Sequence, residues 1–351
     1  MVGLIAVLFA SLIALRVLTA FDRDPTIFVA FGVDATAISD YAETRLGREV
    51  TKRDRQGHDG KYFFVQANDP LVLDPEENIV VIDRPLYRSQ RMFYPMLAGG
   101  VGLFSADIIV WSLLMVNLIA MGVGSWAVAH LAIEMGGSPW WGLLFVLNIG
   151  FINEMNIDGA GVVAAAAAFG AVVLILKHRF AWAIALLTIA ALSREAMLIA
   201  AAGSAFWLWR KGEERHSALL VAGIPLAAVA LWATYVRLRI EFDTGVSQVQ
   251  EIGLPFVGAI GAIQLWASDP LDMAAGIAVI MLLLLFTRRV LVSGELLGWA
   301  FLGFVPLAIL FTRQVWSGYF DITRAVAPVL TAFVLLVFLA GRATERTSVR
   351  P

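Results

Sequence analysis

Long apolar runs separated by short polar segments dominate the chain. A helix needs about 20 apolar residues to cross roughly 30 Å of hydrocarbon. The runs that approach this length are 2–20, 106–133, 139–152, 159–176, 180–192, 195–209, 217–236, 271–287, 291–311 and 324–341. Of these, 139–152 and 180–192 are shorter than a full crossing. The pattern predicts an all-α polytopic membrane protein with about nine to eleven transmembrane helices.

Residues 21–94 interrupt this apolar pattern. They hold ten of the 26 Lys and Arg residues and thirteen of the 28 Asp and Glu residues. The spacing of apolar positions in 34–50 predicts an amphipathic helix at the membrane interface, and 92–104 is expected to form a partial helix that enters the membrane. The organisation that we expect is one transmembrane domain over 1–341, with 21–94 as a long, partly helical first loop, and a short cytoplasmic tail over 342–351.

Lys and Arg in the short loops predict the orientation. With a cytoplasmic N-terminus, the inner side collects Lys177, Arg179, Arg210, Lys211, Arg215, Arg288, Arg289, Arg342, Arg346 and Arg350. The outer turns then hold Arg194, Arg237, Arg239, Arg313 and Arg324. This asymmetry places 21–94 outside the cytoplasm. The first run lacks a basic start and a small-residue cleavage end, so we expect it to be a retained span and not a removed signal peptide.

Composition narrows the classes of function. Hydrophobic residues make up 60% of the chain, charged residues 15%, and mean hydropathy is +0.79. The net charge of −2 gives no basic field for nucleic acid. Cysteine is absent and the four histidines are not at metal-ligand spacing. We therefore expect no zinc, iron–sulfur or thiolate chemistry.

The stretch GHDGKYFF at 57–64 is the first candidate for chemistry. Gly57 and Gly60 permit close approach of the backbone to a ligand. Asp59 is a candidate general base, with His58 and Tyr62 beside it as candidate cavity residues and Tyr62, Phe63 and Phe64 as stacking surfaces for sugar rings. The alternative is that Asp59 only caps the helix that follows.

A second candidate is DRPLYRSQRMFYP at 83–95. On a helix that begins at Pro85, Arg84, Arg88 and Arg91 would share one face, with Tyr87 and Tyr94 near it. Several guanidinium groups together suit phosphate oxygens. The alternative is that these arginines contact ordinary phospholipid headgroups.

Charged residues between the spans form the third group. Glu154 and Asp158 lie in one outer turn, and Arg194 and Glu195 lie in the next. Charges at membrane depth are costly and point to function. The alternatives are a helix cap for Asp158 and pairing with helix ends for Arg194 and Glu195. YFDITR, with Tyr319, Asp321 and Arg324, is a weaker candidate for the same cavity.

The three stretches GHDGKYFFVQANDP, YRSQRMFYPMLAGG and SREAML, together with the multi-span pattern, resemble the GT-C membrane glycosyltransferases and, more narrowly, uncharacterised bacterial proteins related to them. The resemblance covers about 200 residues from the first loop through about the first six spans, whereas the last third matches in hydropathy alone. It implies a polyprenyl-phosphate sugar donor, a glycan or lipid acceptor and an inverting transfer.

The resemblance also implies roles for residues. Asp59 would be the catalytic base, with Glu195 and Arg194 in the outer cavity, and Arg88 and Arg91 would bind the lipid phosphate. Glu195 is the second candidate catalytic residue, and Arg84 and Arg194 are further candidate ligands of the lipid phosphate. Many members of the family carry paired acids just after the first span, where this chain reads FDRDP. Asp22 and Asp24 are therefore alternative catalytic acids. No cofactor is expected, and metal independence is favoured over a divalent metal.

The predicted location is a bacterial inner membrane with the active face extracytoplasmic, in contact with membrane lipids. Two other classes of function stay open from the sequence. One is a transporter or flippase of a lipid-linked or anionic substrate, which the broken run 139–152 leaves open. The other is a non-catalytic scaffold for envelope assembly.

Overall fold

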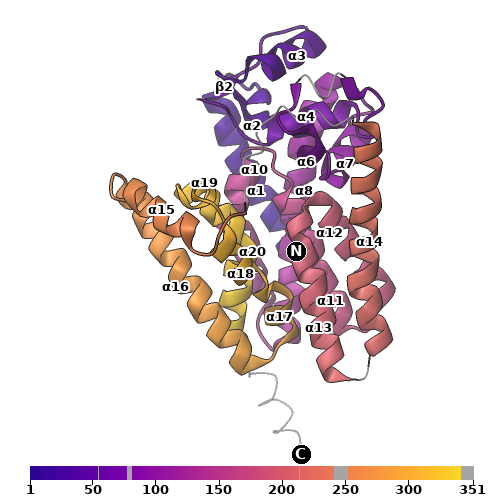
Figure 1. Cartoon of the computed structure of the whole chain (residues 1–351), viewed down its shortest axis with the longest axis vertical. Helices are drawn as coiled ribbons and strands as arrows, with labels where there is room; N and C mark the ends of the chain where they lie inside the picture. The colour runs from indigo at the N-terminus through magenta and orange to yellow at the C-terminus, as the bar shows by residue number, and fades with distance from the viewer. Residues whose placement is uncertain (54, 77–80, 213, 241–251, 341–351) are drawn as a thin grey trace, which may run out of the picture.

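The computed structural model describes residues 1–53, 55–76, 81–212, 214–240 and 252–340. Its secondary structure is almost entirely helical, with one two-stranded parallel sheet (Figure 1). Five helices are long and apolar enough to cross a membrane, namely α1 (Val2–Ala20), α8 (Ala106–Glu134), α14 (Arg215–Arg239), α16 (Pro270–Ser293) and α20 (Tyr319–Leu339). This confirms the prediction of an all-α protein with membrane-spanning segments.

Shorter helices complete the bundle. They are η1 (Pro139–Gly142), α9 (Leu143–Val146), α10 (Ile149–Met155), α11 (Gly161–Leu176), α12 (Phe180–Ser193), η2 (Glu195–Met197), α13 (Leu198–Lys211), α15 (Val257–Trp266), α17 (Leu296–Leu302), α18 (Phe304–Leu310) and α19 (Arg313–Trp316). Two of the expected spans are broken. Run 139–152 divides into η1, α9 and α10, and run 291–311 divides at Gly294 and Gly303. α15 lies outside the runs that were expected to span.

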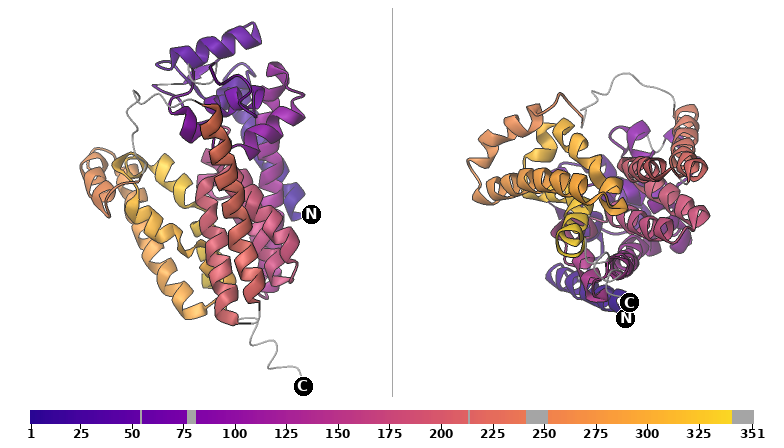
Figure 2. Two further views of the ribbon diagram at one scale, coloured as in Figure 1. Left: turned by 45° about the vertical axis from the view of Figure 1, so that its right-hand side comes forward. Right: turned by 90° about the horizontal axis from the view of Figure 1, so that it is seen from below.

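The core of the bundle forms around α11. The alanine run 164–168 is buried throughout, and α11 packs against α8 on one side and α12 on the other. Small side chains let these helix backbones approach closely, which is the packing expected between helices in lipid. Figure 2 shows α11 to α14 side by side, with α15 and α16 on another side of the molecule, packed against α19 and α20.

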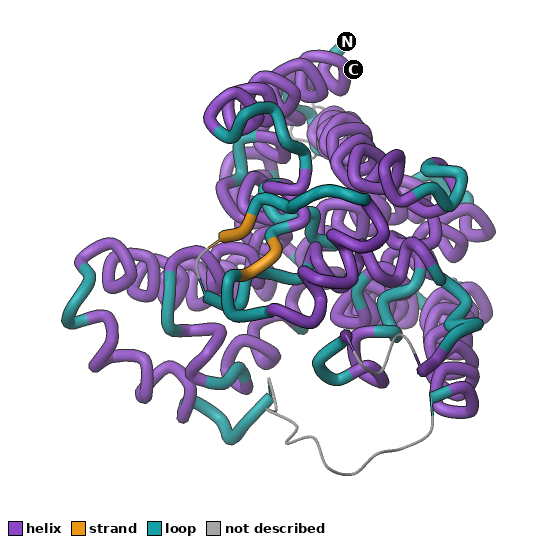
Figure 3. The backbone as a smooth tube through the Cα atoms, turned by 90° about the horizontal axis from the view of Figure 1, so that it is seen from above, coloured by secondary structure: helices purple, strands orange, loops and turns teal. Residues whose placement is uncertain are grey.

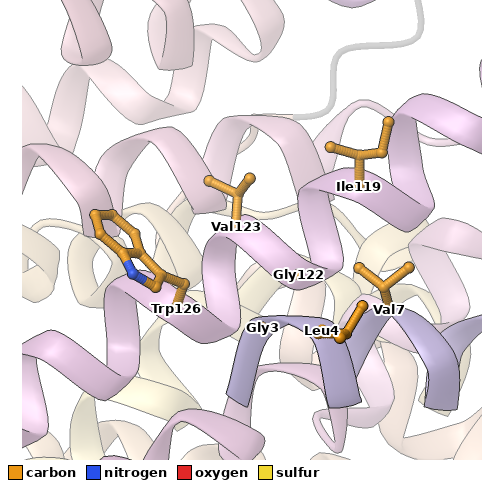
Figure 4. A pocket seen from close by; sticks show the side chains of 7 residues that line it. All are labelled: Gly3, Leu4, Val7, Ile119, Gly122, Val123 and Trp126. Atoms are coloured by element: carbon orange, nitrogen blue, oxygen red, sulfur yellow. The ribbon is translucent and has the colours of Figure 1, made fainter. Parts of the chain in front are cut away.

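Apolar side chains also cover the outside of the bundle. α1, α14 and α16 are mostly exposed, with leucines such as Leu8, Leu231 and Leu284 facing outward. A shallow, open groove between α1 and α8, lined by Gly3, Val7, Gly122 and Trp126 among others, is part of this apolar surface (Figure 4). Such a surface suits contact with lipid tails.

The first polar segment forms a cap at one end of the bundle. The cap contains α2 (Thr26–Val29), β1 (Phe31–Gly32), α3 (Thr36–Leu46), β2 (Lys52–Arg53), α4 (Gly60–Asn68), α6 (Pro85–Arg88) and α7 (Phe93–Val101). α3 falls within the expected interfacial helix, and α7 falls within the expected partial helix. The turn from α13 to α14 lies at the opposite end of the bundle (Figure 1). Figure 3 shows the cap from above, with the two strands over the ends of the helices.

Candidate functional site

Two glycines fix the backbone on either side of His58 and Asp59. Gly57 has a φ of +67°, and a Cβ on it would lie 2.1 Å from the carbonyl oxygen of Ala30. A Cβ on Gly60 would lie 2.4 Å from the carbonyl oxygen of Ile157. No other residue type fits these close approaches. The segment that carries Asp59 is therefore held between β1 and the turn that precedes α11.

Asp59 is the N-cap residue of α4, but its side chain makes no capping hydrogen bond. The Nη1 of Arg88 donates to Asp59 Oδ1 at 2.7 Å, and the Nη1 of Arg91 lies 3.5 Å from Oδ2. The Nη2 of Arg324, from α20, lies 3.7 Å from the same Oδ2. Asp59 thus occupies the N-cap position without capping the helix through its side chain, and its carboxylate is the shared partner of three guanidinium groups.

Each of these three arginines also has a second acid. Arg88 donates to Asp83 at 3.0 Å. Arg91 makes a bidentate contact with Glu195, at 2.9 and 3.0 Å. Bidentate arginine–carboxylate pairs are the strongest and most directional of such contacts.

Arg324 has its second acid in Glu154, whose Oε1 lies 3.2 Å from the arginine Nε, and it also donates to Asp321 at 3.2 Å. Arg194 donates to the same Glu154 Oε1 at 2.9 Å. Four arginines and three buried or half-buried acids therefore form one continuous ionic network. We call these residues the ionic network: Asp59, Arg88, Arg91, Glu154, Arg194, Glu195 and Arg324.

The ionic network lies at the surface of the cap end but is largely covered. The side chains of Arg88, Arg91 and Arg324 are each 10% exposed, whereas those of Asp59 and Glu195 are 27% and 30% exposed. Taking several charges out of water is costly unless every charge is paired. Asp59 and Glu195 are thus more exposed to solvent than the arginines that they pair with, whereas Glu154 is 3% exposed.

The arginines shift the titration of both half-buried acids. Burial alone would raise the pKa of Asp59, but Arg88, Arg91 and Arg324 outweigh it and hold that pKa well below its usual range. Burial is likewise outweighed at Glu195, where Arg91 lowers the pKa to about 2. Both acids are ionised at neutral pH, and in this arrangement they are weak proton acceptors.

His58 lies beside the ionic network with its ring tilted against that of Phe320, at a centroid distance of 4.9 Å. Burial, together with the positive charges of Arg324 and Arg53, lowers the pKa of His58 to about 4. The imidazole is therefore neutral at physiological pH.

The aromatic residues of the two motifs have different positions. The guanidinium of Arg88 lies 4.2 Å from the ring centre of Tyr62, and that of Arg91 lies 4.9 Å from the ring centre of Tyr87, whose hydroxyl accepts a hydrogen bond from Arg91. These rings orient the two arginines from one side. Tyr94 is fully buried, and its hydroxyl donates to the carbonyl oxygen of Leu113.

The expectation that Phe63 and Phe64 offer stacking surfaces for sugars is wrong. Phe63 packs edge-on against Tyr94, and Phe64 packs edge-on against Phe31, so both rings belong to the core. The expectation that Arg84, Arg88 and Arg91 share one helix face is also wrong. α6 ends at Arg88, and Arg84 lies before it with a φ of +79°. Arg84 makes a long ion pair, 4.0 Å, with Asp83 at the edge of the site.

The two alternative acids have other surroundings. Asp24 accepts hydrogen bonds from Thr26 and Thr51 and pairs with Arg48 at 3.1 Å, which ties the turn after α1 to the segment before β2. Asp22 is exposed on the turn after α1. Neither makes an ion pair with the described arginines of the ionic network. Across the part of the chain that the structure describes, no group of three or more His, Asp or Glu residues could hold a metal ion.

Asp158 lies in the turn between α10 and α11, directly beneath Gly60. It is completely buried, and neither carboxylate oxygen makes a hydrogen bond with a described residue. The N-cap of α11 is Ala160, so the interpretation of Asp158 as the cap of that helix is wrong. Burial raises the pKa of Asp158 well above its ordinary value, and nearby Asn117 and Arg53 offset only part of this rise.

Glu154 and Arg324 are central to the ionic network, although only weak indications of their role were visible in the sequence. Both are charged residues next to, or within, long apolar stretches. A charge next to an apolar stretch was the feature that could have identified them, because a charged side chain at membrane depth needs a buried partner. Arg324 pairs with Asp59 and Glu154, which lie in two distant segments of the chain, and a single sequence does not indicate which segments meet.

No protein-family model, no curated protein and no solved structure matches this chain.

The buried Asp158 leads to a prediction about stability. A carboxyl group whose pKa is raised by folding stabilises the protein most at low pH, and this contribution is lost as the pH rises toward the folded-state pKa. We expect the melting temperature of the wild-type protein in detergent to fall from pH 5 to pH 9. Asp158→Asn keeps the shape without the charge, so its melting temperature should fall less.

The matched control is Asp40→Asn, which removes the charge of an exposed acid on α3 of the cap. It should follow the wild-type profile. Parallel profiles for the wild type and Asp158→Asn would show that Asp158 is not held in its neutral form.

Proposed function

We propose that this protein is a membrane glycosyltransferase that moves a sugar from a polyprenyl-phosphate donor to a glycan or lipid acceptor. The observation that supports this most directly is the convergence of Asp59, Arg88, Arg91 and Glu195 on one network. These residues come from three separate stretches of the sequence that together resemble the GT-C enzymes. The network also lies where the polar cap meets the apolar bundle, which is where a lipid phosphate would be found.

In the proposed step, the oxygen of an acceptor hydroxyl forms a bond to the anomeric carbon of the sugar. The bond from that carbon to the phosphate oxygen breaks, and its electron pair leaves with the phosphate. Arg88 and Arg91 stabilise the negative charge that develops on the leaving phosphate. Asp59 takes the proton from the acceptor hydroxyl. A single displacement of this kind inverts the anomeric centre.

The proposed location is a bacterial inner membrane with a cytoplasmic N-terminus and the site on the outer face. The cap carries the ionic network at one end of the bundle, and the basic turn from α13 to α14 lies at the other end (Figure 1). Arg210 and Lys211 end α13, and Arg215 begins α14. An excess of Lys and Arg in short loops favours the cytoplasmic side.

A transporter or flippase of an anionic lipid is the second candidate. The segments η1–α9–α10 and α17–α18 are discontinuous helices, which are frequent around transport sites. The ionic network, however, lies at the cap end and not midway along the long helices. A transporter would move a polyprenyl-phosphate sugar without breaking its glycosidic bond, and a scaffold would do neither.

Turnover by purified protein in lipid nanodiscs tests the proposed function. With a polyprenyl-phosphate sugar and an acceptor, the wild type should release polyprenyl phosphate. Asp59→Asn should lower the rate about 10²–10⁴-fold because a general base is lost. Arg88→Gln and Arg91→Gln should each lower it about 10–100-fold because a charge-assisted hydrogen bond to phosphate is lost.

Arg179→Gln is the control, since Arg179 is an exposed arginine next to α12 and outside the ionic network. A wild-type rate in Asp59→Asn would show that Asp59 is not the general base. Glu195, Asp22 and Asp24 would then be the candidates for that role. Movement of intact donor across the membrane, without release of polyprenyl phosphate, would favour the transporter.

Orientation can be tested directly because the chain has no cysteine. Single cysteines can replace two exposed residues, Glu49 in the cap and Arg179 between α11 and α12. On intact cells, a membrane-impermeant maleimide should label Glu49→Cys and should label Arg179→Cys only after permeabilisation. The reverse pattern would put the ionic network in the cytoplasm and exclude an extracytoplasmic donor site.

A further inference from the structure

The carboxylate of Asp59 occupies the centre of three guanidinium groups. The nearest nitrogens of Arg88, Arg91 and Arg324 lie 2.7, 3.5 and 3.7 Å from its oxygens. Three arginines directed at one small anion form the arrangement that proteins use for phosphate, whose oxygens accept several hydrogen bonds at once. In this structure the anion among the three arginines is the carboxylate of Asp59.

Asp59 can leave this position without stranding an arginine. Arg88 keeps Asp83, Arg91 keeps Glu195 and Arg324 keeps Glu154, all at 3.2 Å or less. A buried guanidinium without any partner would be strongly destabilising. Because each arginine has its own second acid, exchange of the shared anion is the least costly change that the network allows.

The exposed fractions of the side chains also identify Asp59 as the group that a ligand would displace. The side chain of Asp59 is 27% exposed, whereas the three arginines are 10% exposed. A ligand that approaches from solvent or from the membrane surface therefore meets the carboxylate before it meets the guanidinium groups. The ring of Tyr62 on Arg88 holds one of these groups in place while the anion changes.

We propose that Asp59 is a resident substitute for phosphate: it fills the arginine site when no ligand is bound, and the phosphate group of a lipid displaces it. The displacement and the binding site do not depend on the transferase reaction. The consequence for catalysis rests on the proposed function. Once phosphate has taken the three arginines, Asp59 loses the partners that keep it a weak base, so the base becomes competent only beside a bound donor.

Binding of phosphate to Asp59→Asn distinguishes this role from a structural one. Asparagine keeps the shape but removes the competing negative charge. We expect polyprenyl phosphate in nanodiscs to bind Asp59→Asn about tenfold more tightly than the wild type, since one charge-assisted contact no longer has to be broken. Arg88→Gln should bind it about tenfold more weakly. Asp40→Asn, with the same change in charge at an exposed position of the cap, should bind as the wild type does.

Inorganic phosphate is the second ligand in this experiment. Equal affinity for both ligands would identify free phosphate as the species recognised, whereas a marked preference for the lipid form would identify a headgroup site. Weaker or unchanged binding in Asp59→Asn would overturn the proposal, as would the absence of phosphate binding in every variant.

A measurement on the wild-type protein covers the case in which Asp59→Asn does not fold. With ¹³C-labelled aspartate, infrared difference spectra should show a shift in a carboxylate band when polyprenyl phosphate is added, because Asp59 exchanges guanidinium partners for water. An unchanged spectrum at saturating lipid would contradict the displacement. These readouts need no turnover, so tight binding with an unaffected rate would uphold the displacement and refute Asp59 as the base.

Discussion

Guanidinium groups gathered at the end of an apolar bundle must be neutralised where they lie, and the cap end of this protein is organised by that requirement. Charges taken out of water are tolerated only when each has a partner in good geometry. Four arginines alternate here with Asp59, Glu154 and Glu195, and the pairs connect the cap, α10, the segment between α12 and α13, and the start of α20. The same contacts that hold these segments together create a cluster of positive charge around one exchangeable acid.

Hydrophobicity made most of the membrane part of the fold predictable. α1, α8, α14, α16 and α20 agree with apolar runs because a long helix in lipid needs little beyond length and apolar composition. The breaks near Asn148 and Gly303 were not predictable in the same way. At Asn148 the side chain accepts a hydrogen bond from the next helix and donates to Thr331 of α20, so a tertiary contact stabilises the interruption.

The candidate site could be predicted only in part, because several of its contacts depend on tertiary packing. Local motifs identified Asp59, Arg88 and Arg91, because glycines beside an acid and closely spaced arginines are visible in a short stretch. The length of α6 was missed, since the helix pattern does not show that the chain turns after Arg88. The pairing of Arg324 with Glu154 depends on the packing of α20 against α10, and that contact has no local signature. Tertiary packing also decided that Phe63 and Phe64 are core residues.

The central claim is that the arginines around Asp59 form a site for lipid phosphate. An experimental structure of the wild-type protein in nanodiscs with bound polyprenyl phosphate tests it most directly. Our account predicts the phosphorus atom among Arg88, Arg91 and Arg324, with the Asp59 carboxylate moved out of hydrogen-bond distance of Arg88. A lipid phosphate bound elsewhere, with the 2.7 Å contact between Arg88 and Asp59 unchanged, would contradict it.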